Sequence, residues 1–171
     1  MASFFSKVNV IEIISEHIKT FGYKSRLKVL IADCFLFLGI PIVFGLSYGV
    51  MQYYKITKGV PASCWGTAVT ITTIFTPLTL TLLTSLYSMK EKLAPNPKAL
   101  LLLREIIYNI CYAIVVSLLL LIITVVIQAL GLESSIVGSA IFIVAFLHLM
   151  LTLLMIIKRF VALFLEAVEF D

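Results

Sequence analysis

The chain has 171 residues, of which 61% are apolar or aromatic and only 13% are charged, and its formal net charge is +4. Soluble domains contain roughly 45–50% apolar and about 25% charged residues, so a domain of this size has no interior large enough to bury so much apolar surface. The composition therefore excludes disordered chains, coiled coils and almost every soluble fold. It predicts an all-α integral membrane protein with no room for a soluble catalytic domain.

The first 28 residues are predicted to form a cytoplasmic amphipathic segment ahead of the first span. Seven charged residues and the lack of a long apolar run distinguish this segment from a cleavable signal peptide. Apolar side chains recur at helical spacing within residues 4–21, namely Val8, Ile11, Ile14 (or Ser15) and Ile18. Such a helix either lies at the level of the lipid headgroups or packs on the cytoplasmic ends of helices three and four.

Four stretches are long and apolar enough to cross the hydrocarbon core, which takes about 20 residues per helix. They form a transmembrane domain over residues 29–157, with spans at about 29–51, 65–89, 106–130 and 136–157. Asn96 and Pro97 suit an N-cap and a first helical position, so the third helix should begin there and project into the cytoplasm. The fourth helix has no breaker and should continue past Arg159 into a cytoplasmic C-terminal end, residues 158–171.

The distribution of Lys and Arg predicts the orientation, because these residues concentrate in cytoplasmic loops. Eleven lie in the N-terminal segment, the connection between spans two and three, and the C-terminal end, against Lys55 and Lys58 on the other side. We therefore expect a multi-pass membrane protein with both termini in the cytoplasm. Seven of these basic residues are candidates for binding an anionic ligand: Lys24, Arg26, Lys28, Lys90, Lys92, Lys98 and Arg104. The alternative is that they only set the topology and meet anionic lipid.

Two titratable residues fall within the spans, where polar groups are costly. Asp33 lies about one turn inside the first span and is either an interfacial acid paired with a basic residue such as Arg104 or an acid lining a cation path. His148 of the fourth span is either hydrogen-bonded to a neighbouring helix or a proton sensor. Gly45 and Gly49 of the first span form a small-xxx-small pair, which favours close helix contact.

The second span contains eight threonines. Three of them cluster on one side of the helix, Thr72, Thr76 and Thr79, and five cover much of the other, Thr67, Thr70, Thr73, Thr81 and Thr84. Pro77 cannot donate to the carbonyl of Thr73, which favours a kink at mid-membrane. We expect either a water-lined pore helix, in which Thr72, Thr73, Thr76, Pro77 and Thr79 are gate candidates, or a helix that packs through its threonines.

The third span carries a weakly polar stripe. Its members fall within an arc of about 100°: Asn109, Ala113, Ser117, Thr124 and Gln128. Such a stripe either holds helices together or contributes Asn109, Ser117 and Thr124 to a pore lining.

The chain shows no nucleophile–base pair, phosphate loop or metal-ligand spacing, so we expect neither an enzyme nor a bound cofactor or metal. The function classes that remain are an ion channel or pore, a small transporter subunit, and a non-conducting membrane assembly factor. One four-helix bundle is filled by its own side chains, so conduction requires several subunits around an axis. A homo-tetramer is the expectation.

The layout resembles the small four-span membrane effectors of bacterial anti-phage defence operons, above all the channel subunits of Hailong systems, with Kiwa membrane subunits as the competing match. The resemblance rests on the charged helix IEIISEHIK, Asp33 before Gly39 and Pro41, the sequence LRE at 103–105, and the span end MIIKRF at 155–160. It implies a homo-oligomeric inner-membrane channel gated by a cytosolic ligand, whose opening depolarises the infected cell. For a Hailong-like protein the ligand would be a DNA oligomer made by a nucleotidyltransferase partner; for others, the trigger would be a cytosolic sensor.

Overall fold

The computed structural model describes residues 10–20, 35–93 and 96–168, and all regular structure within them is helical. In chain order the elements are α1 (Val10–Thr20), the π-helical turn η1 (Phe35–Gly39), α3 (Ile40–Tyr53), α4 (Ala62–Leu93), α5 (Pro97–Ala129) and α6 (Ile136–Val168). Among the described residues, η1 with α3, and α4, α5 and α6, are long and apolar enough to cross a membrane. An all-helical chain with four candidate membrane spans is thus confirmed.

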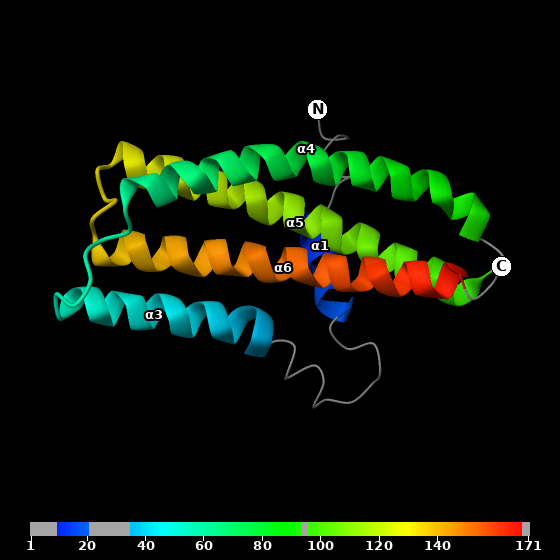
Figure 1. Cartoon of the computed structure of the whole chain (residues 1–171), viewed down its shortest axis with the longest axis horizontal. Coiled ribbons are helices and arrows are strands. Elements are labelled where there is room, and N and C mark those ends of the chain that lie inside the picture. Colours follow the sequence, from blue (N-terminus) through cyan, green and yellow to red (C-terminus); the bar gives the residue numbers. More distant parts are fainter. Residues whose placement is uncertain (1–9, 21–34, 94–95, 169–171) are drawn as a thin grey trace.

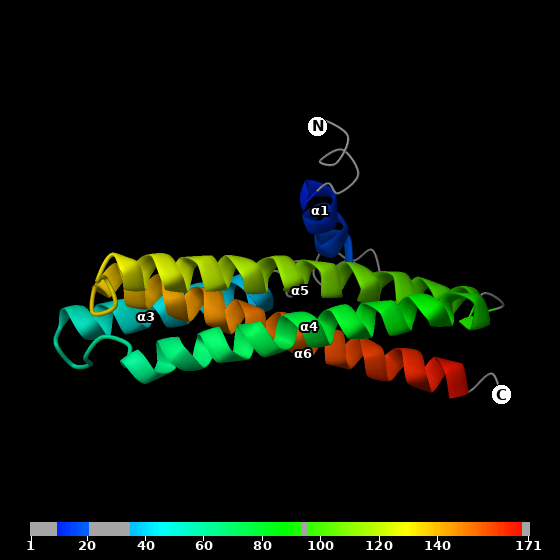
Figure 2. The same cartoon turned by 90° about the horizontal axis from the view of Figure 1, so that it is seen from above.

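The long helices are neighbours in the order α4, α5, α6 and α3, because α4 packs on α5, α5 on α6, and α3 on α6. Figure 1 shows α4, α5 and α6 as long rods lying alongside one another, with the shorter α3 next to α6 over one half of its length. The short helix α1 runs across the axis of these rods and contacts α5 near its middle (Figure 2). α4 therefore lies at one edge of the row.

Two apolar clusters fill the seams between these helices. The cluster near the α3–α4 and α5–α6 loops includes Trp65 of α4 and Phe142 of α6, whose ring centroids lie 4.2 Å apart. The cluster at the opposite end includes Leu86 of α4, Leu103 of α5 and Leu163 of α6. Each cluster joins three helices, so the ends of the row are held together although α3 packs mainly on α6.

Helix ends follow local chemistry. The Asn96 side chain accepts hydrogen bonds from the backbone N–H groups of Lys98 and Ala99 at 3.0 and 3.1 Å, and Pro97 is the first residue of α5, which confirms the predicted N-cap. α6 continues without a break past Arg159 to Val168, also as predicted. α5 and α6 have 33 residues each and are therefore ~50 Å long at 1.5 Å per residue.

The α3–α6 contact depends on one glycine of the predicted small-xxx-small pair. A Cβ atom at Gly45 would collide with the Val144 side chain and lie 2.9 Å from the Ala140 carbonyl oxygen. At Gly49 the nearest atoms would lie at ordinary van der Waals distances of 3.4 Å or more. Gly45 is therefore the residue that allows the two backbones to approach.

Replacing Gly45 by Ala should destabilise the fold by ~1–3 kcal/mol, the usual cost of overpacking a well-filled contact. Gly66 is the matched control, because a Cβ atom there has no neighbour within 4 Å. Gly66→Ala should be neutral or stabilising, since Ala favours a helix over Gly by ~1 kcal/mol. Thermal unfolding in detergent measures both, and equal effects would contradict the close α3–α6 approach.

Candidate functional site

α4 carries hydroxyl groups on two opposite faces. The face toward α5 holds Thr72 and Thr79, which are buried, and Thr76, whose Oγ1 lies 3.1 Å from Ser117 Oγ of α5. The opposite face is exposed from Ser63 to Ser88. Its eight hydroxyl residues, here called the hydroxyl face, are Ser63, Thr67, Thr70, Thr73, Thr81, Thr84, Ser85 and Ser88. At 100° per residue they lie within an arc of about 120°, opposite the packed face.

The threonines of the hydroxyl face donate their protons to carbonyl groups of α4 itself. Thr67 bonds the Ser63 carbonyl at 2.8 Å, and Thr70 bonds the Gly66 carbonyl at 3.0 Å. Thr73, Thr81 and Thr84 donate in the same way at 2.8–3.0 Å. A hydroxyl oxygen that has donated its proton still has lone pairs to accept from water or from another protein.

Among the four candidate spans, the more polar a span is, the smaller is its buried share. α4 is the least apolar of them and also has the smallest buried share, whereas α5 is the most apolar and the most buried. A lipid-surrounded monomer is expected to show the reverse, because polar groups are costly in hydrocarbon. The hydroxyl face is therefore expected to meet water or another protein surface.

The weakly polar stripe of α5 lies inside the row of helices. Asn109, Ala113, Ser117 and Thr124 are all buried, and Ser117 contacts Thr76 of α4. Their position between helices of one subunit favours the helix-packing interpretation of this stripe. Gln128, at the end of the stripe, is exposed.

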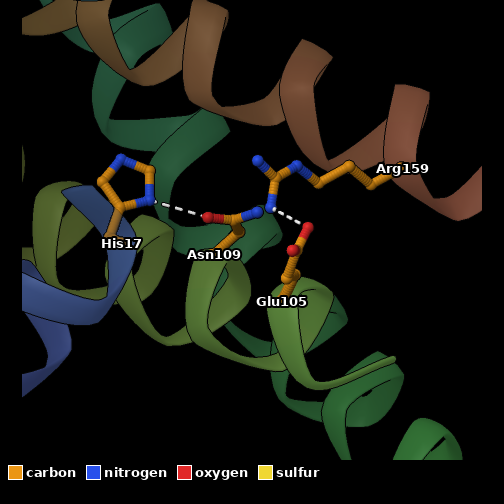
Figure 3. A network of polar contacts seen from close by, with 4 residues as sticks. All are labelled: His17, Glu105, Asn109 and Arg159. Carbon is orange, nitrogen blue, oxygen red and sulfur yellow. Dashed lines mark hydrogen bonds and ion pairs between the residues drawn. The ribbon is translucent and has the colours of Figure 1, made fainter. Parts of the chain in front are cut away.

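Elements α1, α5, α6 and η1 meet through polar contacts, here called the polar junction, made by His17, Asn109, Tyr112, His148 and the Phe37 carbonyl. Nδ1 of His17 lies 2.7 Å from Oδ1 of Asn109. Figure 3 shows this contact as a dashed line. The His17 ring also stacks on Tyr112, with centroids 3.7 Å apart and planes 12° apart. The Tyr112 hydroxyl in turn lies 2.8 Å from His148 Nε2.

His148 contacts a backbone carbonyl of η1 close to Pro41. Proline has no N–H group, so Pro41 cannot bond the Phe37 carbonyl four residues before it. His148 Nδ1 lies 2.9 Å from this carbonyl, which can only accept, so Nδ1 carries the proton. In a neutral ring Nε2 then accepts from the Tyr112 hydroxyl. His148 is thus hydrogen-bonded to two neighbouring elements, the first of the two alternatives that the sequence left open.

His17 is 2% exposed, and this burial lowers its pKa to about 4. The hydrogen bond to Asn109 acts in the opposite direction, and the positive charge of Arg159 lowers the pKa further. His17 is therefore neutral at physiological pH. Its ring docks α1 on α5, whereas the apolar Ile11 and Ile14 of α1 are exposed.

An ion pair lies beside the polar junction. Arg159 of α6 donates through Nη1 to Glu105 Oε2 of α5 at 2.8 Å, and the two side chains are 14% and 13% exposed (Figure 3). The sequence patterns above do not single out this pair or the docking role of His17. A usable signal exists for the pair: Glu105 and Arg159 are equally far in sequence from Leu132 in the α5–α6 turn, so an antiparallel hairpin brings them level.

The candidate anionic-ligand residues are only partly placed. Lys90, Lys98 and Arg104 are exposed near the α4–α5 connection, and Lys92 belongs to the last turn of α4. Arg104 Cζ lies 5.6 Å from the centre of the Tyr108 ring, and Lys90 Nζ lies 5.9 Å from that of Tyr87. The others, Lys24, Arg26 and Lys28, and also Asp33, lie outside the described residues.

No protein family model, no curated protein and no solved structure matches this chain. Its function has to be inferred from its own residues. The features that bear on function are the hydroxyl face of α4, the polar junction that docks α1, and the exposed basic residues near the α4–α5 connection.

Acidification should release α1 from α5. Undocked His17 has its ordinary pKa of 6.5, against about 4 when docked, so the docked form is fully stable above pH 6.5 and loses stability as the pH falls from 6.5 toward 4. By pH 5 the loss amounts to ~2 kcal/mol. After correction for the intrinsic pH dependence of amide exchange, the protection factors of residues 10–20 in detergent should therefore be lower at pH 5 than at pH 7.5.

The variant His17→Gln is the control for this titration, because glutamine keeps a polar side chain but carries no titratable group. Its protection factors over residues 10–20 should be the same at both pH values. A pH dependence that persists in the variant would assign the effect to another titratable group.

Proposed function

We propose that this chain is the subunit of a homo-oligomeric membrane channel whose conducting path is lined by the hydroxyl face of α4. The observation that carries the proposal is the inverse relation between polarity and burial: the span richest in hydroxyl groups is the least buried. A hydroxyl-rich wall keeps a narrow path wet, whereas an apolar wall closes it by dewetting. α4 supports this role because only one of its faces packs on α5.

Several copies are needed to close such a path, because each chain contributes one hydroxyl face. Identical subunits arranged around an axis place the same face of every copy toward that axis. We propose a tetramer. Pro77 lies in the same arc as the hydroxyl face and about midway along α4, where a missing backbone hydrogen bond gives the wall a place to bend.

We further propose that the basic end of the helices faces the cytoplasm and receives the gating signal. Lys90, Lys98 and Arg104 are exposed there, so a ring of subunits presents positive potential to an anionic ligand. In the setting suggested by the resemblance to anti-phage effectors, the ligand is a nucleic-acid oligomer from a partner enzyme, and opening depolarises the infected cell. α1, whose exposed Ile11 and Ile14 suit the headgroup region, connects that surface to α5 and α6 through the polar junction.

A non-conducting assembly factor is the second candidate. The back-bonding of Thr67, Thr70 and Thr73 favours it, because hydroxyl groups that donate to their own helix also fit against another protein without water. Ion flux separates the two candidates, since only a channel conducts.

Replacing Thr70, Thr73 and Thr81 together by Val should abolish conduction and leave expression and oligomer mass unchanged. Valine has nearly the shape of threonine, so the change removes hydroxyl groups without filling the path. The matched control is Thr72→Val, which removes a buried hydroxyl group next to Thr73 on the other face of α4. Ion flux into liposomes, reported by an enclosed fluorescent indicator, is measured for the wild type and for all variants.

A triple variant that conducts like the wild type would remove the hydroxyl face from the path. A loss of flux in Thr72→Val alone would place the path inside the row of helices. A wild-type protein that is a monomer by mass in mild detergent, and that forms no cross-links in membranes, would overturn the channel.

Cysteine labelling of intact cells tests the orientation. A cysteine at Lys58 should react with a membrane-impermeant maleimide, and one at Lys98 should react only after permeabilisation, because the Lys and Arg bias predicts a cytoplasmic α4–α5 connection. The native Cys34, Cys64 and Cys111 are first replaced by Ala. Labelling of position 98 in intact cells would invert the topology.

A further inference from the structure

A groove of about 420 Å³ runs between α4 and α5 near their connection. Its lining is mainly apolar or aromatic, and includes Tyr87 of α4 and Leu100, Leu101 and Ile107 of α5. Only two of its eight lining residues are charged, Lys90 and Arg104, and both charges are positive. The groove thus combines an apolar floor with a cation on each helix.

The two cations flank the groove at the same height. α4 and α5 are antiparallel, and the contact between Thr76 and Ser117 fixes their register. Lys90 follows Thr76 by 14 residues, and Arg104 precedes Ser117 by 13 residues, so each lies ~20 Å along its helix from that contact. Tyr87 and Ile107 lie about one turn closer to the middle of the helices.

This height matches a membrane surface. The stretch of α5 from Ile106 to Ile127 contains no charged residue and is ~33 Å long, close to the ~30 Å thickness of the hydrocarbon core. Arg104, two residues before this stretch, then lies among the headgroups together with Lys90. Ile107 and Tyr87 lie at the edge of the hydrocarbon, where the first methylenes of an acyl chain begin.

We propose that the groove binds an anionic phospholipid of the adjacent leaflet. The lipid phosphate accepts hydrogen bonds from the Lys90 ammonium and the Arg104 guanidinium groups, and the glycerol backbone and one acyl chain lie over Tyr87 and Ile107. Charge complementarity selects an anionic headgroup, and the fork of Arg104 suits phosphate oxygens. This site does not depend on conduction, so it is independent of the proposed conducting path. Lys90 and Arg104 are also among the cations proposed to receive the anionic gating ligand, so a bound lipid and that ligand would compete for them.

The lining favours a lipid over a nucleic-acid oligomer. An oligomer bound through its phosphates needs a row of cations, and bases need aromatic faces on which to stack. The groove offers two cations and aliphatic side chains such as Leu100 and Leu101. A single headgroup can contact the two cations while its acyl chain covers the aliphatic side chains.

Native mass spectrometry of the full chain in detergent tests the site. Delipidated wild-type protein is titrated with phosphatidylglycerol and phosphatidylcholine, each with long and with short acyl chains. We expect a preference for long-chain phosphatidylglycerol. The variant K90Q/R104Q should weaken its binding about 30-fold, since each cation near an anionic lipid contributes about five-fold. K55Q/K58Q, in the opposite loop, is the control of equal charge change and should bind as the wild type does.

Leu101→Gln distinguishes the ligand classes, because it changes the floor but not the charge. For a lipid site it should reduce the preference for long over short acyl chains. The proposal fails if L101Q leaves lipid binding unchanged while a single-stranded DNA oligomer displaces phosphatidylglycerol, since the cations then serve a polyanion. It also fails if K55Q/K58Q weakens phosphatidylglycerol binding as much as K90Q/R104Q does, or if neither variant changes it. Circular dichroism of each variant confirms that its helices are intact.

Discussion

The difference between the length of the helices and the thickness of a bilayer determines where this chain can place its charged and polar residues. α5 and α6 are ~50 Å long, whereas the hydrocarbon core is ~30 Å thick. About two fifths of each helix must therefore lie outside the hydrocarbon. The residues in that part can be charged at little cost, and the Glu105–Arg159 pair lies at the point where the apolar stretch of α5 begins.

The polar junction begins about one turn inside this boundary, at Asn109 of α5, for a related reason. Pro41 removes a backbone donor near the start of the first span, and an unbonded carbonyl group in lipid costs several kcal/mol. His148 supplies a hydrogen bond to the Phe37 carbonyl near this proline, and Tyr112 fixes the His148 ring. The same tyrosine ring stacks on His17, so the repair of one backbone defect also provides the surface on which α1 docks. A change in α1 is thereby coupled to α5, α6 and η1 by direct contact.

Much of the fold could be predicted from the sequence because a bilayer permits few solutions. Length and apolarity give the four spans, and Asn96 with Pro97 gives the start of α5. The row order of the helices could not be predicted, because it depends on contacts such as Gly45 against α6 that no periodicity shows. His17 escaped prediction for a similar reason, since a single histidine on a short helix gives no pattern until Asn109 and Tyr112 are placed beside it.

Part of the candidate site could likewise be predicted from the sequence, and part could not. The separation of the α4 threonines into two sets follows from the helical repeat alone, and the structure confirms that Thr72 and Thr79 are buried while Thr67, Thr70 and Thr73 are exposed. Periodicity cannot say which set faces a neighbour, because a threonine packs on either side of a helix equally well. Only the position of α4 at the edge of the row decides this.

That edge position makes α4 the element on which any function of the exposed surface depends. α5 is the most apolar span and lies between α4 and α6, so the chain uses its most lipid-compatible helix as the interior and leaves its most hydroxylated one outside. A monomer gains nothing from this arrangement, because hydroxyl groups facing acyl chains contribute no favourable contact. An assembly does gain, since copies that bring their α4 helices together remove those hydroxyl groups from lipid and leave the apolar α3 and α6 surfaces toward it. The order of the helices in one chain therefore already favours an assembly with α4 at its centre.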